Sequence, residues 1–106
     1  MYGTVARMRV KAGHMEQLQS MNDKWEQGRG RQVPGYVSSY VLQPDNRPDE
    51  VILFVIFRDR ESYRANGNDP DQDRWYRQMR EHLDADPEWT DGEVVFASTS
   101  PGTKTN

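Results

Sequence analysis

The alternation of apolar and polar residues divides the chain into strands and helices. Apolar residues recur at every second position in strands and at three- and four-residue steps in helices. The pattern predicts strands over residues 2–10, 36–43, 51–57 and 93–98, and helices over residues 14–27, 60–65 and 69–83. The order is strand, helix, strand, strand, helix, strand, with the second helix broken in two. This order predicts an α+β, ferredoxin-like fold with a four-stranded antiparallel sheet.

Short polar and glycine-containing stretches mark the expected helix ends. Gly28-Arg29-Gly30 ends the first helix, and Asn66-Gly67-Asn68 breaks the second. Asp59 can cap the short helix that follows it. Asp69 is a good N-cap with Pro70 at the first helical position, and Gln72 completes the spacing of a capping box.

The segment Val51–Phe57 is apolar at every position and predicts a strand that is covered on both faces. The helices can cover only one of its two sets of side chains. The other set would expose large apolar groups, each worth about 1.5–3 kcal/mol on burial. We therefore expect a homodimer, because closed two-fold dimers are the commonest oligomers. The alternative is that the segment around Trp89 covers this face within one chain.

Length, charge and composition narrow the class of protein. With 106 residues, 34% of them hydrophobic, the chain is long enough for one domain, expected over residues 1–98 with a polar, disordered tail over 99–106. A net charge of −3 without a basic stripe argues against nucleic-acid binding. No apolar run approaches the length of a membrane span, and the N-terminal residues lack a signal peptide's apolar stretch. With no cysteine in the chain, a cytoplasmic location is expected.

Three stretches of the chain carry a likeness to a known family. They are Thr4 to His14, Pro34-Gly35-Tyr36, and Phe57 to Ala65, the last containing a Tyr-Arg-Ala run. Together they resemble the antibiotic-biosynthesis monooxygenase family of the dimeric α+β-barrel superfamily, over roughly residues 2–98. The resemblance implies a homodimeric α+β barrel with a pocket between sheet and helices. It also implies oxidation of a small aromatic or quinol-like molecule without metal or flavin, in which the substrate anion delivers electrons to oxygen.

Such chemistry requires a group that takes a proton and donors that hold the anion. Tyr63 and Asn66, beside the helix break, and His82, one of two histidines, are the candidate catalytic residues. Asn66 could equally cap the helix end. His82 could instead be a cation favoured by the dipole at a helix C-terminus.

Five further residues are candidates for substrate binding. Arg7 and Arg9 share a strand face and could hold an anionic oxygen, although both could also form surface ion pairs. Trp75, Tyr76 and Met79 lie on the long helix and suit a flat aromatic ligand. The alternative is that Trp75 and Met79 are ordinary core.

No cofactor or metal is expected. No cluster of histidine and carboxylate residues has metal-ligand spacing, and no phosphate-binding or dinucleotide motif is present. Haem-degrading relatives in the superfamily carry an asparagine, a tryptophan and a histidine at positions where this chain departs from the pattern. The leading hypothesis is therefore a cofactor-independent monooxygenase. The alternatives are a non-catalytic small-molecule-binding barrel and, less favoured, a haem-binding or haem-degrading protein.

Overall fold

The computed structural model describes residues 1–101 and contains one four-stranded sheet. Its strands are β1 (Tyr2–Arg9), β2 (Tyr36–Leu42), β3 (Glu50–Phe57) and β4 (Glu88–Glu93). The spatial order is β2-β3-β1-β4, and every neighbouring pair is antiparallel. The predicted ferredoxin-like topology is confirmed.

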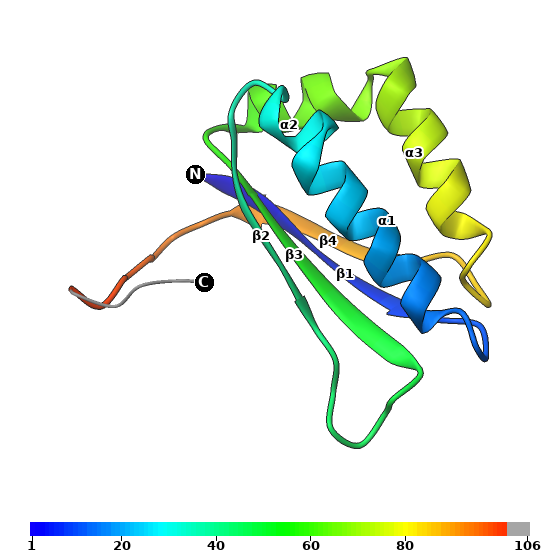
Figure 1. Cartoon of the computed structure of the whole chain (residues 1–106). Helices are drawn as coiled ribbons and strands as arrows, with labels where there is room; N and C mark the ends of the chain where they lie inside the picture. The colour runs from blue at the N-terminus through cyan, green and yellow to red at the C-terminus, as the bar shows by residue number, and fades with distance from the viewer. Residues whose placement is uncertain (102–106) are drawn as a thin grey trace.

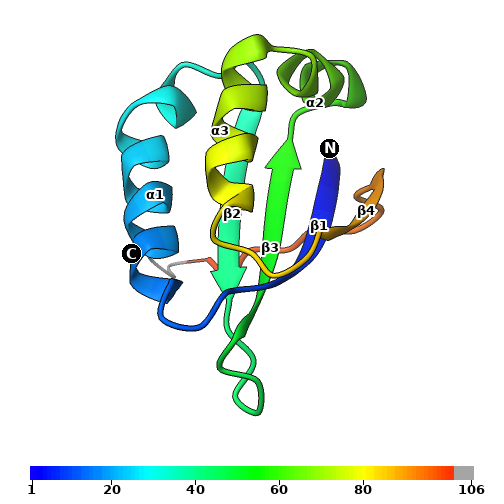
Figure 2. The same cartoon turned by 90° about the vertical axis from the view of Figure 1, so that its right-hand side faces the viewer.

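All the helices cover one face of this sheet (Figures 1 and 2). They are α1 (Met15–Gln27), the 3₁₀ helix η1 (Arg29–Arg31), α2 (Arg60–Gly67) and α3 (Pro70–Arg80). The Asp59 side chain accepts from the Ser62 amide at 2.7 Å, as expected of an N-cap. The Asp69 side chain likewise accepts from the Asp71 amide at the start of α3.

The predicted capping box at α3 is wrong in one respect. The Gln72 side chain does not reach back to Asp69 but accepts a hydrogen bond from Arg29 at 3.3 Å. The short helix also ends two residues later than expected, because α2 continues through Gly67 rather than stopping at Ala65, and Asn68 is its C-cap. The amide side chains of Asn66 and Gln72 lie at the junction of α2 and α3, where both accept hydrogen bonds from Arg29 of η1.

The core lies between the sheet and the helices. Alternate residues of β1 from Tyr2 onward are buried and the intervening ones from Val5 onward are exposed, as the period of two predicts. The fully packed cluster joins β1, β3, α1 and α3 and consists of Met8, Val10, Leu18, Val51, Met79 and Leu83. A cavity lies beside this cluster, between the sheet and the helices.

On the opposite face of the sheet, β2 and β3 present apolar side chains that nothing covers in a single chain. Ile52, Phe54 and Ile56 of β3 are half-buried there, flanked by exposed Tyr40 and Leu42 of β2. Trp89 does not cover this face. It pairs with Ala6 in the register of β1 and β4 and therefore points to the helix side.

The position of the last strand differs from the prediction. β4 covers Glu88–Glu93 rather than residues 93–98; its sequence is polar apart from Trp89, and every residue in it is exposed. The apolar stretch that suggested a strand follows it, with Val95 93% and Phe96 80% exposed. An edge strand needs only backbone pairing with β1, so its apolar content is a poor guide to its position. The predicted disordered tail covers residues 99–106, and its last five residues, 102–106, lie outside the described residues. No helix within residues 1–101 is long and apolar enough to cross a membrane.

Candidate functional site

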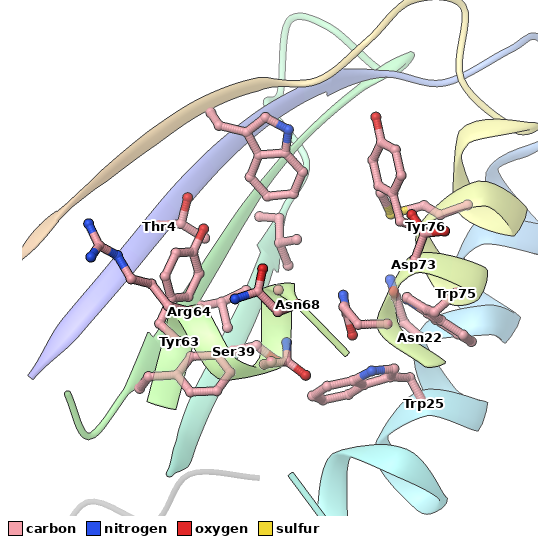
Figure 3. Close-up of a pocket in the computed structure, with 18 of the residues that line it drawn as sticks. Thr4, Asn22, Trp25, Ser39, Tyr63, Arg64, Asn68, Asp73, Trp75 and Tyr76 are labelled. Carbon is pink, nitrogen blue, oxygen red and sulfur yellow. The ribbon is translucent and has the colours of Figure 1, made fainter. Parts of the chain in front are cut away.

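A cavity of about 740 Å³ lies between the helix-facing side of the sheet and helices α1, α2 and α3 (Figure 3). This volume falls within the range of roughly 300–1,000 Å³ that is typical of small-molecule sites. Tyr63 and Thr4 lie on one side of the cavity, and Tyr76 and Asp73 on the opposite side.

Aromatic side chains supply much of the wall. All three tryptophans of the chain line it: Trp25 from α1, Trp75 from α3 and Trp89 from β4. Tyr76 stands beside Trp89 with ring centroids 6.4 Å apart. Such a wall suits a flat aromatic molecule, because stacked and edge-on rings add to the energy of burial.

A tyrosine, a threonine and an aspartate form a hydrogen-bonded group at the β4 side of the cavity. Asp91 Oδ1 accepts from Tyr63 Oη at 3.0 Å and from Thr4 Oγ1 at 2.6 Å. Thr4 and Asp91 are paired in the register of β1 and β4, and Tyr63 reaches them from α2. Burial, together with the Asp91 charge, raises the pKa of Tyr63. The Tyr63 phenol therefore stays protonated at neutral pH and donates a hydrogen bond to the Asp91 carboxylate. The lone pairs of Tyr63 Oη remain free to accept a proton.

An amide group lies near the helix break. Asn66 lines the cavity from the last turn of α2, and its Oδ1 accepts a hydrogen bond from Arg29 Nη2 at 2.6 Å. The interpretation of Asn66 as the helix cap is wrong, because Asn68 takes that position. Asn66 and Tyr63, two of the three candidate catalytic residues, are thus brought together at one cavity.

The third candidate catalytic residue lies elsewhere. His82 does not line the cavity and faces His14, with 3.0 Å between the two Nδ1 atoms. His14, the N-cap of α1, is half-buried.

The candidate binding residues separate into two groups. Trp75, Tyr76 and Met79 line the cavity, and Met79 is also part of the packed core. Arg7 and Arg9 do not line it. They are exposed on the opposite face of the sheet, where Arg9 lies 3.9 Å from Asp49. This placement corrects the expectation that their strand face lines the pocket.

Several lining or supporting residues, among them Trp25 of α1 and Thr4 of β1, escaped prediction as site residues. Trp89 and Asp91 lie in β4, which the hydrophobic pattern did not detect. Correct placement of that strand would have put Asp91 opposite Thr4, so sheet register was the missing signal.

Charged groups are few at the cavity. Glu26, Arg64 and Asp73 are its charged lining residues, and all three are exposed. Asp73 is also paired with Arg77 at 3.0 Å. Among residues 1–101, no three or more histidine and carboxylate side chains group closely enough to hold a metal ion.

Both the sequence and the fold of this chain match those of known proteins. The sequence model of the family described as antibiotic biosynthesis monooxygenase matches residues 1–78. The chain is similar in structure to a variant of SnoaB, a cofactor-independent oxygenase from Streptomyces nogalater, with a TM-score of 0.78 and 15% identity over 94% of this chain and 96% of that one. It is also similar to Rv0793 from Mycobacterium tuberculosis, with a TM-score of 0.76 and 17% identity over 92% and 98% of the two chains. A comparison with curated proteins gives no match.

Proposed function

The chain belongs to the antibiotic biosynthesis monooxygenase family, and we propose that it oxidises a small aromatic, quinol-like molecule in its cavity without metal or flavin. The proposal rests on one observation. An aromatic-walled cavity brings an amide, Asn66, together with a phenol–carboxylate pair, Tyr63 and Asp91. These are the two kinds of group that the chemistry needs: a donor for an anion and an acceptor for a proton.

The reaction we propose is the conversion of the ring CH₂ group that lies opposite a carbonyl in the central ring into a second carbonyl. An anthrone (C₁₄H₁₀O) and O₂ give an anthraquinone (C₁₄H₈O₂) and water. Loss of a proton makes the electron-rich anion, which passes an electron to O₂. The resulting radicals combine into a peroxide, and the peroxide loses water. The substrate supplies all the electrons, so the protein must only remove the proton, hold the anion and exclude bulk water.

Each polar residue then has a defined task. The substrate proton passes to Tyr63 Oη as the Tyr63 proton passes to Asp91, along the 3.0 Å hydrogen bond between them. Asp91 is exposed, so the proton can leave to solvent. The Asn66 amide nitrogen donates to the anionic oxygen that forms.

The experiment is oxygen uptake with 1,8-dihydroxyanthrone, corrected for the uncatalysed reaction in buffer. We expect Asn66→Ala and Tyr63→Phe each to reduce kcat by about 10²-fold or more, the scale of losing one preorganised donor or one proton-transfer group. Asn46→Ala, which removes an exposed amide from the β2–β3 loop, is the matched control and should react as the native chain does. Absence of uptake above background with anthrones and hydroquinones would exclude the proposal.

A homodimer through the uncovered sheet face is part of the proposal. Apolar side chains of β2 and β3 on that face, with exposed Val95 and Phe96 beyond β4, are the surface that a second copy would bury. We expect a dimer by size-exclusion chromatography with light scattering. Phe54→Asp should weaken it by at least about 100-fold, because each of two copies loses roughly 1.5–3 kcal/mol of burial. Ala65→Asp on α2 is the control, and a monomeric native chain would refute the dimer.

A non-catalytic binding barrel is the second candidate, favoured by the aromatic wall, which would hold a flat ligand with or without turnover. Because every tryptophan lines the cavity, ligand entry should quench the intrinsic fluorescence. Saturable quenching by 1,8-dihydroxyanthraquinone without oxygen uptake from the anthrone would support this candidate over the enzyme.

A further inference from the structure

We propose that Arg29 is a positioning residue that fixes the orientation of the Asn66 amide, so that its NH₂ group faces the ligand. The inference rests on the proposed function, which gives Asn66 the task of holding an anion. It concerns a residue outside the cavity lining and assigns a role to the Gly28-Arg29-Gly30 stretch that otherwise only ends a helix.

The contacts of Arg29 determine which way the amide turns. Its Nη2 donates to Asn66 Oδ1 at 2.6 Å, and its Nε donates to Gln72 Oε1 at 3.3 Å. A guanidinium has donors only, so it selects the oxygen end of each amide. The NH₂ group of Asn66 must then point away from Arg29, and within residues 1–101 it has no side-chain hydrogen-bond partner. Since Asn66 lines the cavity and Arg29 does not, the free donor is directed to the cavity side.

Arg29 is itself held in place. Its side chain is only 21% exposed and lies 3.6 Å from the carboxylate of Asp69, the N-cap of α3. Its neighbour Gly30 is buried against Trp25, and a Cβ at Gly30 would come 2.6 Å from the Trp25 ring. The guanidinium thus ties η1 to the end of α2 and the start of α3, next to a tryptophan of the cavity wall.

Orientation matters because the asparagine amide carries a hydrogen-bond acceptor, its carbonyl oxygen, on one side and a donor, its NH₂ group, on the other. Rotation by half a turn about its terminal bond would present the carbonyl oxygen, which repels an anion, in place of the NH₂ donor. A lysine could keep the positive charge but not the fork that binds two amide oxygens at once. Arg29→Lys therefore separates orientation from charge.

The test is a double-mutant cycle on ligand affinity. The probe is 1,8-dihydroxyanthraquinone, which cannot be turned over, and its dissociation constant is measured by tryptophan fluorescence. We expect Arg29→Lys to weaken binding by about three- to tenfold in the native background, as for loss of a hydrogen bond between neutral groups. In the Asn66→Ala background the same change should alter affinity by less than about twofold, because coupled residues are non-additive. Arg31→Lys, in the same η1 but exposed, is the matched control.

Equal weakening in both backgrounds would show a general structural effect and overturn the inference, as would native-like affinity of Arg29→Lys. A second measurement does not depend on ligand or turnover. The two Nδ2 proton signals of Asn66, assigned by their absence in Asn66→Ala, should shift and approach each other in Arg29→Lys. Unchanged signals would refute the positioning role even if the protein oxidised the anthrone. Shifted signals would support it even if no oxygen were consumed.

Discussion

Replacing Asp91 by asparagine is the sharpest test of the proton pathway. The change keeps the size of the side chain and an oxygen that can accept from Tyr63 and Thr4, at 3.0 and 2.6 Å in the native chain. It removes the negative charge and the basicity. The geometry of the group should therefore survive while its capacity to accept a proton is lost.

The structure gives the expected magnitudes for Asp91→Asn. Loss of a positioned base lowers kcat by about 10²–10⁴-fold, which is roughly 2.7–5.4 kcal/mol in the barrier. The stability cost is smaller. Two hydrogen bonds change from charged to neutral at an exposed residue, which we put at about 1 kcal/mol in total. KM should change little, because neither Asp91 nor its charge belongs to the aromatic wall.

The assay is anthrone-dependent oxygen uptake as a function of pH, with unfolding by urea measured on the same preparations. Asp49→Asn is the matched control, since it removes a carboxylate paired with Arg9 outside the cavity. The pKa of Tyr63, followed by phenolate absorbance, should fall toward its ordinary value in Asp91→Asn, while burial keeps it raised. A kcat within threefold of the native value would refute the pathway from Tyr63 to Asp91.

Three further predictions concern stability and the cavity wall. The amide of Ser62, its hydroxyl and the neighbouring Arg58 lower the pKa of Asp59 from 3.8 to about 2, so the charged cap stabilises the fold above pH 3.8. That contribution should disappear between pH 3.8 and 2, and urea unfolding of Asp59→Asn should show a smaller loss over this window. Leu83→Ala, at a position with no exposed surface, should lower the free energy of unfolding by about 2–5 kcal/mol in urea titrations. Gly30→Ala should lower the melting temperature and weaken anthraquinone binding, because the new Cβ displaces the Trp25 ring; unchanged fluorescence and affinity would contradict this.

The fold was predictable because its signals are local and repeated. The alternation over residues 2–10 predicted that successive side chains point to opposite faces of the sheet, and the burial pattern of β1 and its register with β3 confirm this. The caps Asp59 and Asp69 predicted where α2 and α3 begin. These features depend on backbone geometry and on one apolar surface, both of which a single segment of sequence records.

The site was only partly predictable because it depends on pairs that are distant in sequence. Tyr63, Asn66 and Tyr76 were found from their residue types near a helix break. Asp91 was not, because β4 is an edge strand whose exposed residues carry no hydrophobic period. Arg29 was not either, since its partners follow it by 37 and 43 residues and nothing in its own segment indicates them.

The junction of α2 and α3 shows how local rules can hide a site. Helix ends leave backbone groups unpaired, so polar side chains collect there for structural reasons alone. Gln72 stands at the capping-box position of α3, but its side chain accepts a hydrogen bond from Arg29. The Asn66 side chain, in the last turn of α2, also accepts from Arg29. Gln72 therefore makes a contact with the charged, largely buried guanidinium of Arg29 in place of a capping hydrogen bond. Departure of a residue from its local rule is expected where function competes with stability. The contacts of Asn66 and Gln72 are therefore better explained by their place in the cavity wall than by the capping of α2 or α3.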